Sequence, residues 1–110
     1  MTITTVAKSL RRLKKINSEI SYASLAEGGT FTSGIIVFRP RSADDAKQIR
    51  HSDKDVICEV LRGSGRLRIN RRRIALKAGM FCHIPKGTPH DFAASKTNRL
   101  VLFYSLIETG

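Results

Sequence analysis

The chain has 110 residues, which is the length of one domain with a modest core. Apolar residues make up 41% of it, a proportion typical of a globular protein and too high for a disordered one. Its longest apolar runs, Ile35–Phe38 and Leu100–Tyr104, are much shorter than the ~20 residues that cross a bilayer. Because no apolar segment follows the basic N-terminus, we expect no secretory signal, no membrane association and a cytoplasmic protein.

Positive charge is the unusual property of the composition, with 20 Lys and Arg against 9 Asp and Glu and a net charge of +11. Five basic residues lie between Lys8 and Lys15, and seven lie between Arg62 and Lys77. Such surfaces attract anions, including nucleic acid. No motif that reads bases accompanies the charge, so we expect it to keep the protein in solution and nucleic acid to be an unlikely partner.

The N-terminal residues 1–27 are predicted to form a basic arm that packs on the rest of the chain. Leu10, Leu13 and Ile16 recur at helical spacing, which favours a short amphipathic helix. A loose arm without regular structure is the alternative.

The remaining residues, 28–110, are predicted to form one all-β domain. Residues 28–34 indicate a turn that leads into Ile35–Phe38, a β-branched run typical of a strand buried on both faces. A polar loop over 39–50 follows. We expect further strands at 56–61, 66–69, 74–76, 80–84, 90–93 and 99–106, separated by turns at 63–65, 70–72 and 77–79 and by a rigid loop at 85–89. Short strands at this spacing favour a sandwich or a barrel.

One segment carries a recognisable motif. Residues 79–90 read Gly-Met-Phe-Cys-His-Ile-Pro-Lys-Gly-Thr-Pro-His, in which a glycine turn, a strand and a Pro-x-Gly loop precede a histidine. This resembles the second conserved motif of the cupin family, and residues 55–65 resemble the strand and turn of the first. The resemblance covers residues 30–106 and implies a small RmlC-like cupin, that is, a double-stranded β-helix or jelly-roll barrel. Ala94 stands where the family has an asparagine.

The resemblance also implies a metal site, although the first motif departs from the family pattern. Metal-binding cupins supply two histidines and a glutamate from that motif. Val56 stands at the glutamate position and Ile49 at one histidine position, while His51 stands at the other. His51 and His90 therefore remain of the four ligands, and two imidazoles alone bind a metal weakly. The candidates for a further ligand are Asp53, Asp55 and His83.

Strand alternation predicts the inner wall of the barrel. Starting from Val56, it directs Cys58 and Val60 inward and Glu59 outward, so the predicted pocket is more apolar than that of a metal-loaded cupin. Cys58 near His90 could be a soft ligand or a thiol with a lowered pKa. Buried free thiols are the simplest interpretation of Cys58 and Cys82, since a disulfide requires neighbouring strands.

Two classes of function stay open. The resemblance implies a metal-dependent isomerase, lyase or dioxygenase, with one divalent Zn, Fe, Ni or Mn ion that polarises a carbonyl or enol oxygen of a small, anionic substrate. The alternative is a metal-free barrel that binds a small ligand or acts as a sensor. In both cases we expect a homodimer, because Ile35–Phe38 and Leu100–Tyr104 are too apolar to be half solvated.

Overall fold

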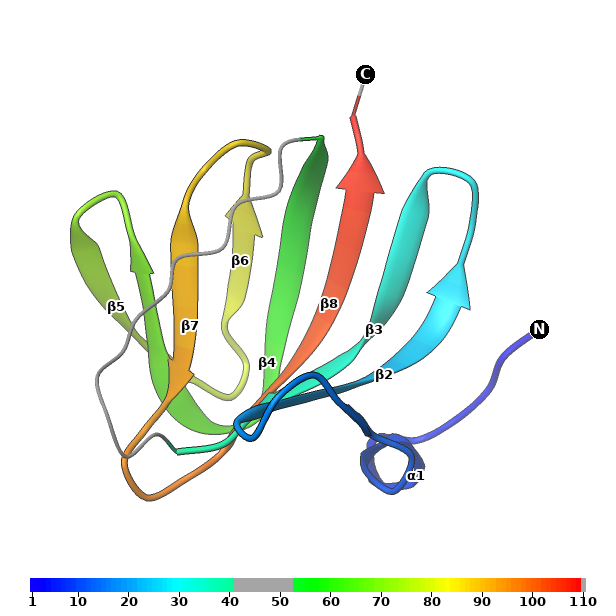
Figure 1. Cartoon of the computed structure of the whole chain (residues 1–110), viewed down its shortest axis with the longest axis horizontal. Coiled ribbons are helices and arrows are strands. Elements are labelled where there is room, and N and C mark those ends of the chain that lie inside the picture. The colour runs from blue at the N-terminus through cyan, green and yellow to red at the C-terminus, as the bar shows by residue number, and fades with distance from the viewer. Residues whose placement is uncertain (41–52, 110) are drawn as a thin grey trace.

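A computed structural model describes residues 1–40 and 53–109, and strands make up most of the described chain (Figure 1). The all-β, jelly-roll prediction is confirmed. In chain order, the elements are α1 (Val6–Leu10), β1 (Lys14–Lys15), β2 (Ile20–Glu27), β3 (Phe31–Phe38), β4 (Lys54–Ile69), β5 (Arg72–Lys77), β6 (Phe81–Ile84), β7 (His90–Ala94) and β8 (Leu100–Glu108). Within the described ranges, no helix has the length and apolar character needed to cross a membrane.

The long strand β4 joins two sheets. Strands β1, β2, β3, β8, β4 and β6 form the first sheet in that spatial order, and β5 and β7 flank the second half of β4 in the other. All of these pairs are antiparallel. In Figure 1 the sheet turns over along β4, so that β5 and β7 lie at the side opposite to β2. The space between the two sheets is the interior of the barrel.

The expected turn at residues 63–65 is wrong, because β4 continues through it for 16 residues. The strand instead contains an irregularity between Val60 and Arg62, where its register with β8 shifts. Gly63 has a φ of +80°, and a Cβ there would overlap the carbonyl oxygen of Arg99. The glycine therefore allows the backbone at the start of β8 to come close and allows β4 to bend. Because glycines mark bends within strands as well as turns, the sequence here predicted a turn.

The hairpin between β4 and β5 confirms the turn expected at residues 70–72. Asn70 and Arg71 both have positive φ values, 51° and 62°. Two consecutive residues in this region define a type I′ turn, whose twist matches that of the strands it joins. Asparagine tolerates the left-handed region well, so Asn70 is the residue that makes this turn recognisable in the sequence.

The main core lies between the two sheets, and its buried side chains come from strands β3 to β8. These buried members are Phe38, Val56, Cys58, Val60, Leu67, Leu76, Ile84, Phe92, Leu100 and Leu102. The inward residues of β4 alternate with outward ones, as the sequence pattern predicts for a strand. The core therefore fills much of the barrel interior with apolar groups.

A second, smaller core lies on the outer face of the first sheet. Ile35, Val37 and Val101 form it, and Leu10 and Leu13 of the N-terminal segment pack against them. The apolar run Ile35–Phe38 is thus covered on its outer side by the chain itself, and its burial does not require a partner. Thr5 caps α1 by accepting the backbone N–H of Lys8 at 3.1 Å.

The N-terminal segment contributes more to the sheet than its sequence suggested. The predicted helix is confirmed over Val6–Leu10, while Ile16 is 59% exposed and not part of the buried stripe. Strand β2 lies within the predicted arm, residues 1–27, and pairs with β3 from Ile20 to Glu27. Its sequence, Ile-Ser-Tyr-Ala-Ser-Leu-Ala-Glu, carries a weak alternation that did not identify it as a strand.

Candidate functional site

The barrel interior is the candidate site, and its wall on β4 is apolar. Val56, Cys58 and Val60 are 4%, 3% and 3% exposed and belong to the main core. Glu59 lies on the other face, opposite the exposed Phe81 of β6. The alternation along this strand therefore directs side chains as the sequence predicted.

His90 lies on the inner face of the second sheet and is 4% exposed. Its Nδ1 is 2.9 Å from the carbonyl oxygen of Thr88, which can only accept a hydrogen bond. In the neutral ring, Nδ1 therefore carries the hydrogen and Nε2 has the lone pair of an acceptor or ligand. A backbone carbonyl bound to the other ring nitrogen is the usual arrangement of a metal-ligating histidine.

The loop between β6 and β7 holds His90 in this position. Gly87 has a φ of +80°, and the N–H of Thr88 donates to the carbonyl of Pro85 at 3.3 Å, which closes a tight turn. The His90 ring also meets the Phe92 ring edge-on, with centroids 5.8 Å apart. The Pro-x-Gly segment recognised in the sequence thus sets both the backbone and the ring of His90.

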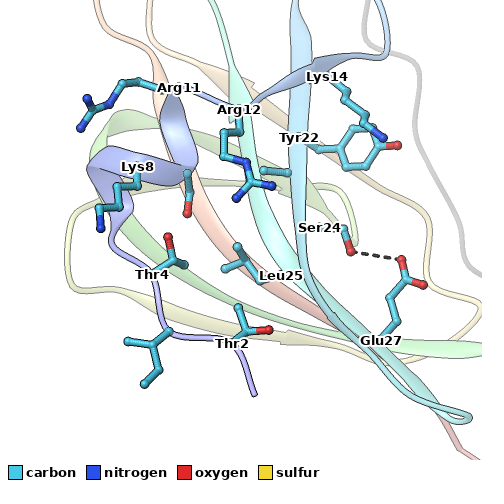
Figure 2. A pocket seen from close by; sticks show the side chains of 13 residues that line it. Thr2, Thr4, Lys8, Arg11, Arg12, Lys14, Tyr22, Ser24, Leu25 and Glu27 are labelled. Carbon is cyan, nitrogen blue, oxygen red and sulfur yellow. Dashed lines mark hydrogen bonds between the residues drawn. The ribbon is translucent and has the colours of Figure 1, made fainter.

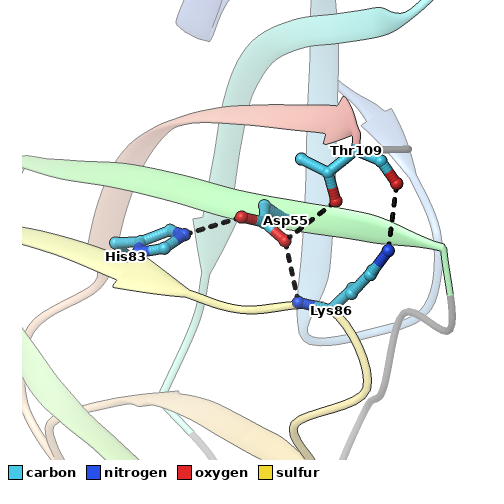
Figure 3. A network of polar contacts seen from close by, with 4 residues as sticks. All are labelled: Asp55, His83, Lys86 and Thr109. Atoms are coloured by element: carbon cyan, nitrogen blue, oxygen red, sulfur yellow. Dashed lines mark hydrogen bonds and ion pairs between the residues drawn. The ribbon is translucent and has the colours of Figure 1, made fainter.

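Asp55 and His83 lie on the outer face of the first sheet and bind each other. The Nε2 of His83 is 2.8 Å from Oδ2 of Asp55, and the backbone N–H of Lys86 donates to Oδ1 of Asp55 at 2.9 Å (Figure 3). The side-chain hydrogen bond from His83, followed by the one from Lys86, holds the pKa of Asp55 below its usual value of 3.8. This network joins the start of β4 to the loop that follows β6.

The structure therefore brings Asp55 together with His83, and neither of them together with His90. Their chain neighbours Val56 and Ile84 are 4% and 1% exposed and face the interior, so Asp55 and His83 face away from it. Among residues 1–40 and 53–109, no three His, Cys, Asp or Glu side chains form a group able to hold a metal. His51, the other predicted ligand, lies outside the described residues.

Two cysteines face each other across β4 and β6. Cys58 and Cys82 are register partners, both thiols are free, and Cys82 is the more exposed of the two. The hydrogen bond between the two sulfurs, followed by burial, raises the pKa of Cys58, while the same bond lowers the pKa of Cys82. The lowered thiol pKa considered for Cys58 is therefore wrong, because the contact with Cys82 and burial both raise it.

Tyr104 of β8 adds a phenol beside this pair. It is the register partner of Gly34 on one side and of Cys58 on the other. A Cβ at position 34 would lie 2.9 Å from the Tyr104 hydroxyl oxygen, so the glycine leaves space for the ring. Burial, and then the charges of Tyr22 and Glu27, raise the pKa of Tyr104, which keeps the phenol protonated at neutral pH.

Asp91 was not identified from the sequence. It is 3% exposed, and its Oδ2 lies 3.6 Å from Arg66 and 3.9 Å from Arg68. Alternation correctly directed both arginines away from Leu67, but the acid that faces them comes from another strand, β7. Their pairing depends on cross-strand register, for which the sequence carries no local signal.

A separate groove of about 880 Å³ lies outside the barrel, between the N-terminal segment and β2 (Figure 2). Four basic side chains line it, together with Glu27, whose carboxylate accepts a hydrogen bond from Ser24 at 3.1 Å. The basic residues are Lys8, Arg11, Arg12 and Lys14. Much of the N-terminal positive charge thus surrounds this outer groove.

Comparison with known proteins agrees with the fold. The sequence matches the Cupin domain family over residues 35–106, which is more than half of the chain. No curated protein matches it in sequence.

Solved structures extend the likeness to nearly the whole chain. The TT1209 protein of Thermus thermophilus superposes with a TM-score of 0.77 at 20% identity, covering 98% of each chain. An RmlC-like cupin from Shewanella frigidimarina has a TM-score of 0.77 at 13% identity and covers 97% of this chain and 90% of its own. The Fe(II) form of HppE has a TM-score of 0.76 at 19% identity, covering 86% of this chain and 55% of its own. The chain belongs to the cupin family.

Proposed function

We propose that the barrel interior binds a small anionic molecule and that His90 is the polar group that contacts it. The observation that carries the proposal is the state of His90, which is 4% exposed on the inner face and donates Nδ1–H to Thr88. A mostly apolar cavity with a few oriented polar groups is the usual form of a small-molecule site. The net charge of +11 favours an anionic ligand over a cationic one.

Two versions of this function are distinguished by a metal ion. In the first, His90 through Nε2 and His51 would hold a divalent Zn, Fe, Ni or Mn ion, which would supply Lewis-acid chemistry toward the ligand. The described residues supply one inward imidazole and leave Asp55 and His83 outside, so this site is incomplete without ligands from elsewhere. In the second, His90 itself contacts the ligand, and the protein is a metal-free binder or sensor.

Thermal unfolding of chelator-treated protein tests both versions. We expect small organic acids, alone or together with one of the four metals, to raise the melting temperature. A ligand at 100 times its Kd adds about 2.7 kcal/mol, which raises the melting temperature of a domain of this size by roughly 10 °C or more. A rise with acids alone supports the metal-free version, and a rise that requires the metal supports the other.

The matched variants are His90→Ala and His83→Ala, which remove an inner and an outer histidine. We expect His90→Ala to abolish the ligand-dependent rise and His83→Ala to retain it. Equal rises in both variants, or no rise with any acid or metal in the wild-type protein, would contradict the proposal.

We further propose that the protein is a homodimer formed through the outer face of the first sheet. Phe31, Ile57 and Phe81 on this face are 41%, 43% and 72% exposed. Exposed apolar groups on one face favour an interface, and a second copy offers the same face by two-fold symmetry. A cytoplasmic location stays a prediction from the sequence.

A further inference from the structure

We propose that Cys58 and Cys82 form a redox pair that a hydroperoxide converts into a reversible cross-strand disulfide inside the barrel. Neither the ligand nor the metal considered above is needed for this reaction. The topology creates the pair, since 24 residues separate the two cysteines in the sequence and β4 and β6 place them directly opposite each other.

The backbone geometry suits a disulfide. The N–H of Val60 donates to the carbonyl of Met80 at 2.8 Å, and Cys58 and Cys82 lie two residues further along each strand. They therefore occupy a hydrogen-bonded position of the ladder, where opposite Cα atoms are about 5.5 Å apart. Disulfides span Cα separations of ~4.4–6.8 Å, so the Cα separation permits the bond, with some strain at the Cβ atoms.

The side chains face the same space. Cys58 is 3% exposed in the main core, and the partly buried Cys82 packs against that core. As register partners on neighbouring strands, they direct their side chains to the same face of the sheet. Closing the bond therefore requires a small rotation of two short side chains.

The two cysteines differ in a way that assigns their roles. Cys82 is the more exposed of the two, and the contact with Cys58 lowers its pKa, which are the properties of the thiol that reacts with a peroxide. Cys58 is buried beside it and protonated, which suits the thiol that resolves the intermediate. Such a pairing of an accessible thiolate with a neighbouring thiol is typical of redox-sensing cysteines.

The chemistry proceeds in two steps. The Cys82 thiolate attacks one oxygen of the hydroperoxide, an S–O bond forms as the O–O bond breaks, and the leaving oxygen takes a proton to give an alcohol or water. Cys58 then attacks the sulfur of the Cys82 sulfenic acid, the S–S bond forms, and the hydroxyl leaves with the Cys58 proton as water. The two thiols lose two electrons, and the hydroperoxide gains them.

The reverse reaction is expected to be easy. A hydrogen-bonded ladder position holds Cβ atoms further apart than a relaxed disulfide prefers, and strained disulfides are reduced more readily. The bond would join β4 to β6 at Cys58, between Val56 and Val60 of the inner wall. Oxidation would thereby stiffen the wall of the candidate site.

Intact mass spectrometry tests the proposal directly, because the chain has only two cysteines. Chelator-treated protein is exposed to hydrogen peroxide, denatured in N-ethylmaleimide and weighed. We expect a species lighter by two hydrogens that takes no maleimide, and the recovery of two maleimide sites after dithiothreitol.

The matched variants Cys58→Ala and Cys82→Ala separate the roles. We expect Cys58→Ala to accumulate a Cys82 sulfenic acid that dimedone captures. We expect Cys82→Ala to react with peroxide at about one tenth of the wild-type rate or more slowly still. If either variant fails to fold, the intact-mass measurement on the wild-type protein still tests whether the disulfide forms.

Three outcomes would overturn the proposal. They are a wild-type protein that still takes two maleimides after peroxide, a sulfinic acid on Cys82 with Cys58 still free, and a disulfide between two chains on a non-reducing gel. None of these depends on whether the interior binds a ligand, so failure here leaves the proposed function to its own test.

Discussion

The two described histidines have opposite surroundings, and the difference follows from the face of the sheet on which each lies. His90 is buried and its Nδ1 binds the backbone carbonyl of Thr88, whereas the side chain of His83 is 56% exposed and its Nε2 contacts the carboxylate of Asp55. An exposed pair of this kind contributes little to stability. His83 therefore serves as the control for His90, because both substitutions remove one imidazole.

At the scale of single residues, we predict how the stability of the protein depends on pH. Asp55 has a pKa below 3.8 in the folded protein, chiefly because of its hydrogen bond with His83. Its contribution is complete above the unfolded pKa and is lost as the pH falls through the lower folded value. We expect the stability advantage of the wild type over Asp55→Asn to shrink below pH ~4.

Urea unfolding midpoints at stepwise pH between neutral and acid measure this effect. Asp53→Asn is the matched control, since Asp53 is an exposed acid two residues away. Its curve gives the effect of removing a nearby carboxylate that is outside the network of Figure 3. If the Asp55→Asn curve runs parallel to that of the wild type, this network carries no pH-dependent stability.

At the scale of elements, β4 organises the molecule. It pairs with β8 and β6 along its first half and with β5 and β7 along its second, so it belongs to both sheets. The strand changes sheets next to Gly63, whose φ of +80° and contact with Arg99 exclude a side chain. Gly63 and Gly65 thus leave room for the neighbouring backbone where β4 passes from one sheet to the other.

Gly63→Ala is expected to destabilise the fold by about 3 kcal/mol, since it combines a strained backbone with an overlap against a neighbouring strand. Chemical unfolding of purified variants measures the change in free energy. Gly29→Ala is the control, because a Cβ there meets nothing within 4 Å, and its effect should stay within ~0.5 kcal/mol. Equal stability of the two variants would mean that the bend of β4 relaxes without cost.

At the scale of the whole molecule, the outer face of the first sheet is covered in one part and open in another. The N-terminal segment covers Ile35, Val37 and Val101, while Phe31 and Phe81 stay exposed. The apolar run Ile35–Phe38, which suggested a dimer in the sequence, is therefore buried within one chain. The case for a dimer now depends on the exposed part of the same face.

Light scattering coupled to gel filtration measures the assembly. We expect the wild type to have twice the mass of the 12.2 kDa chain and Phe81→Ser to have the mass of one chain, because Phe81 is more exposed than the other two apolar side chains of that face, Phe31 and Ile57. Ile16→Ser, which removes an apolar group of 59% exposure near β1, should leave the dimer intact. A wild-type mass of 12.2 kDa would exclude the homodimer.

Local signals in the sequence determined much of this protein. Alternation identified β5 and the inner face of β4, and the glycine and proline spacing of residues 79–90 identified the loop that positions His90. These features depend on neighbours within a few residues, and short-range backbone preferences encode them. The weakly alternating β2 was missed because its burial comes from contacts with β3 and the N-terminal segment.

Only the tertiary structure decided which distant residues meet. Asp55 and His83, Cys58 and Cys82, and Asp91 with its arginines are all pairs across strands, and a register shift of one residue would turn each side chain to the other face. Alternation in one strand shows that a side chain points inward or outward, but not what it faces. The sequence therefore predicted a barrel with His90 inside it. The packing of the strands placed Asp55 at the surface beside His83 and placed the two thiols opposite each other.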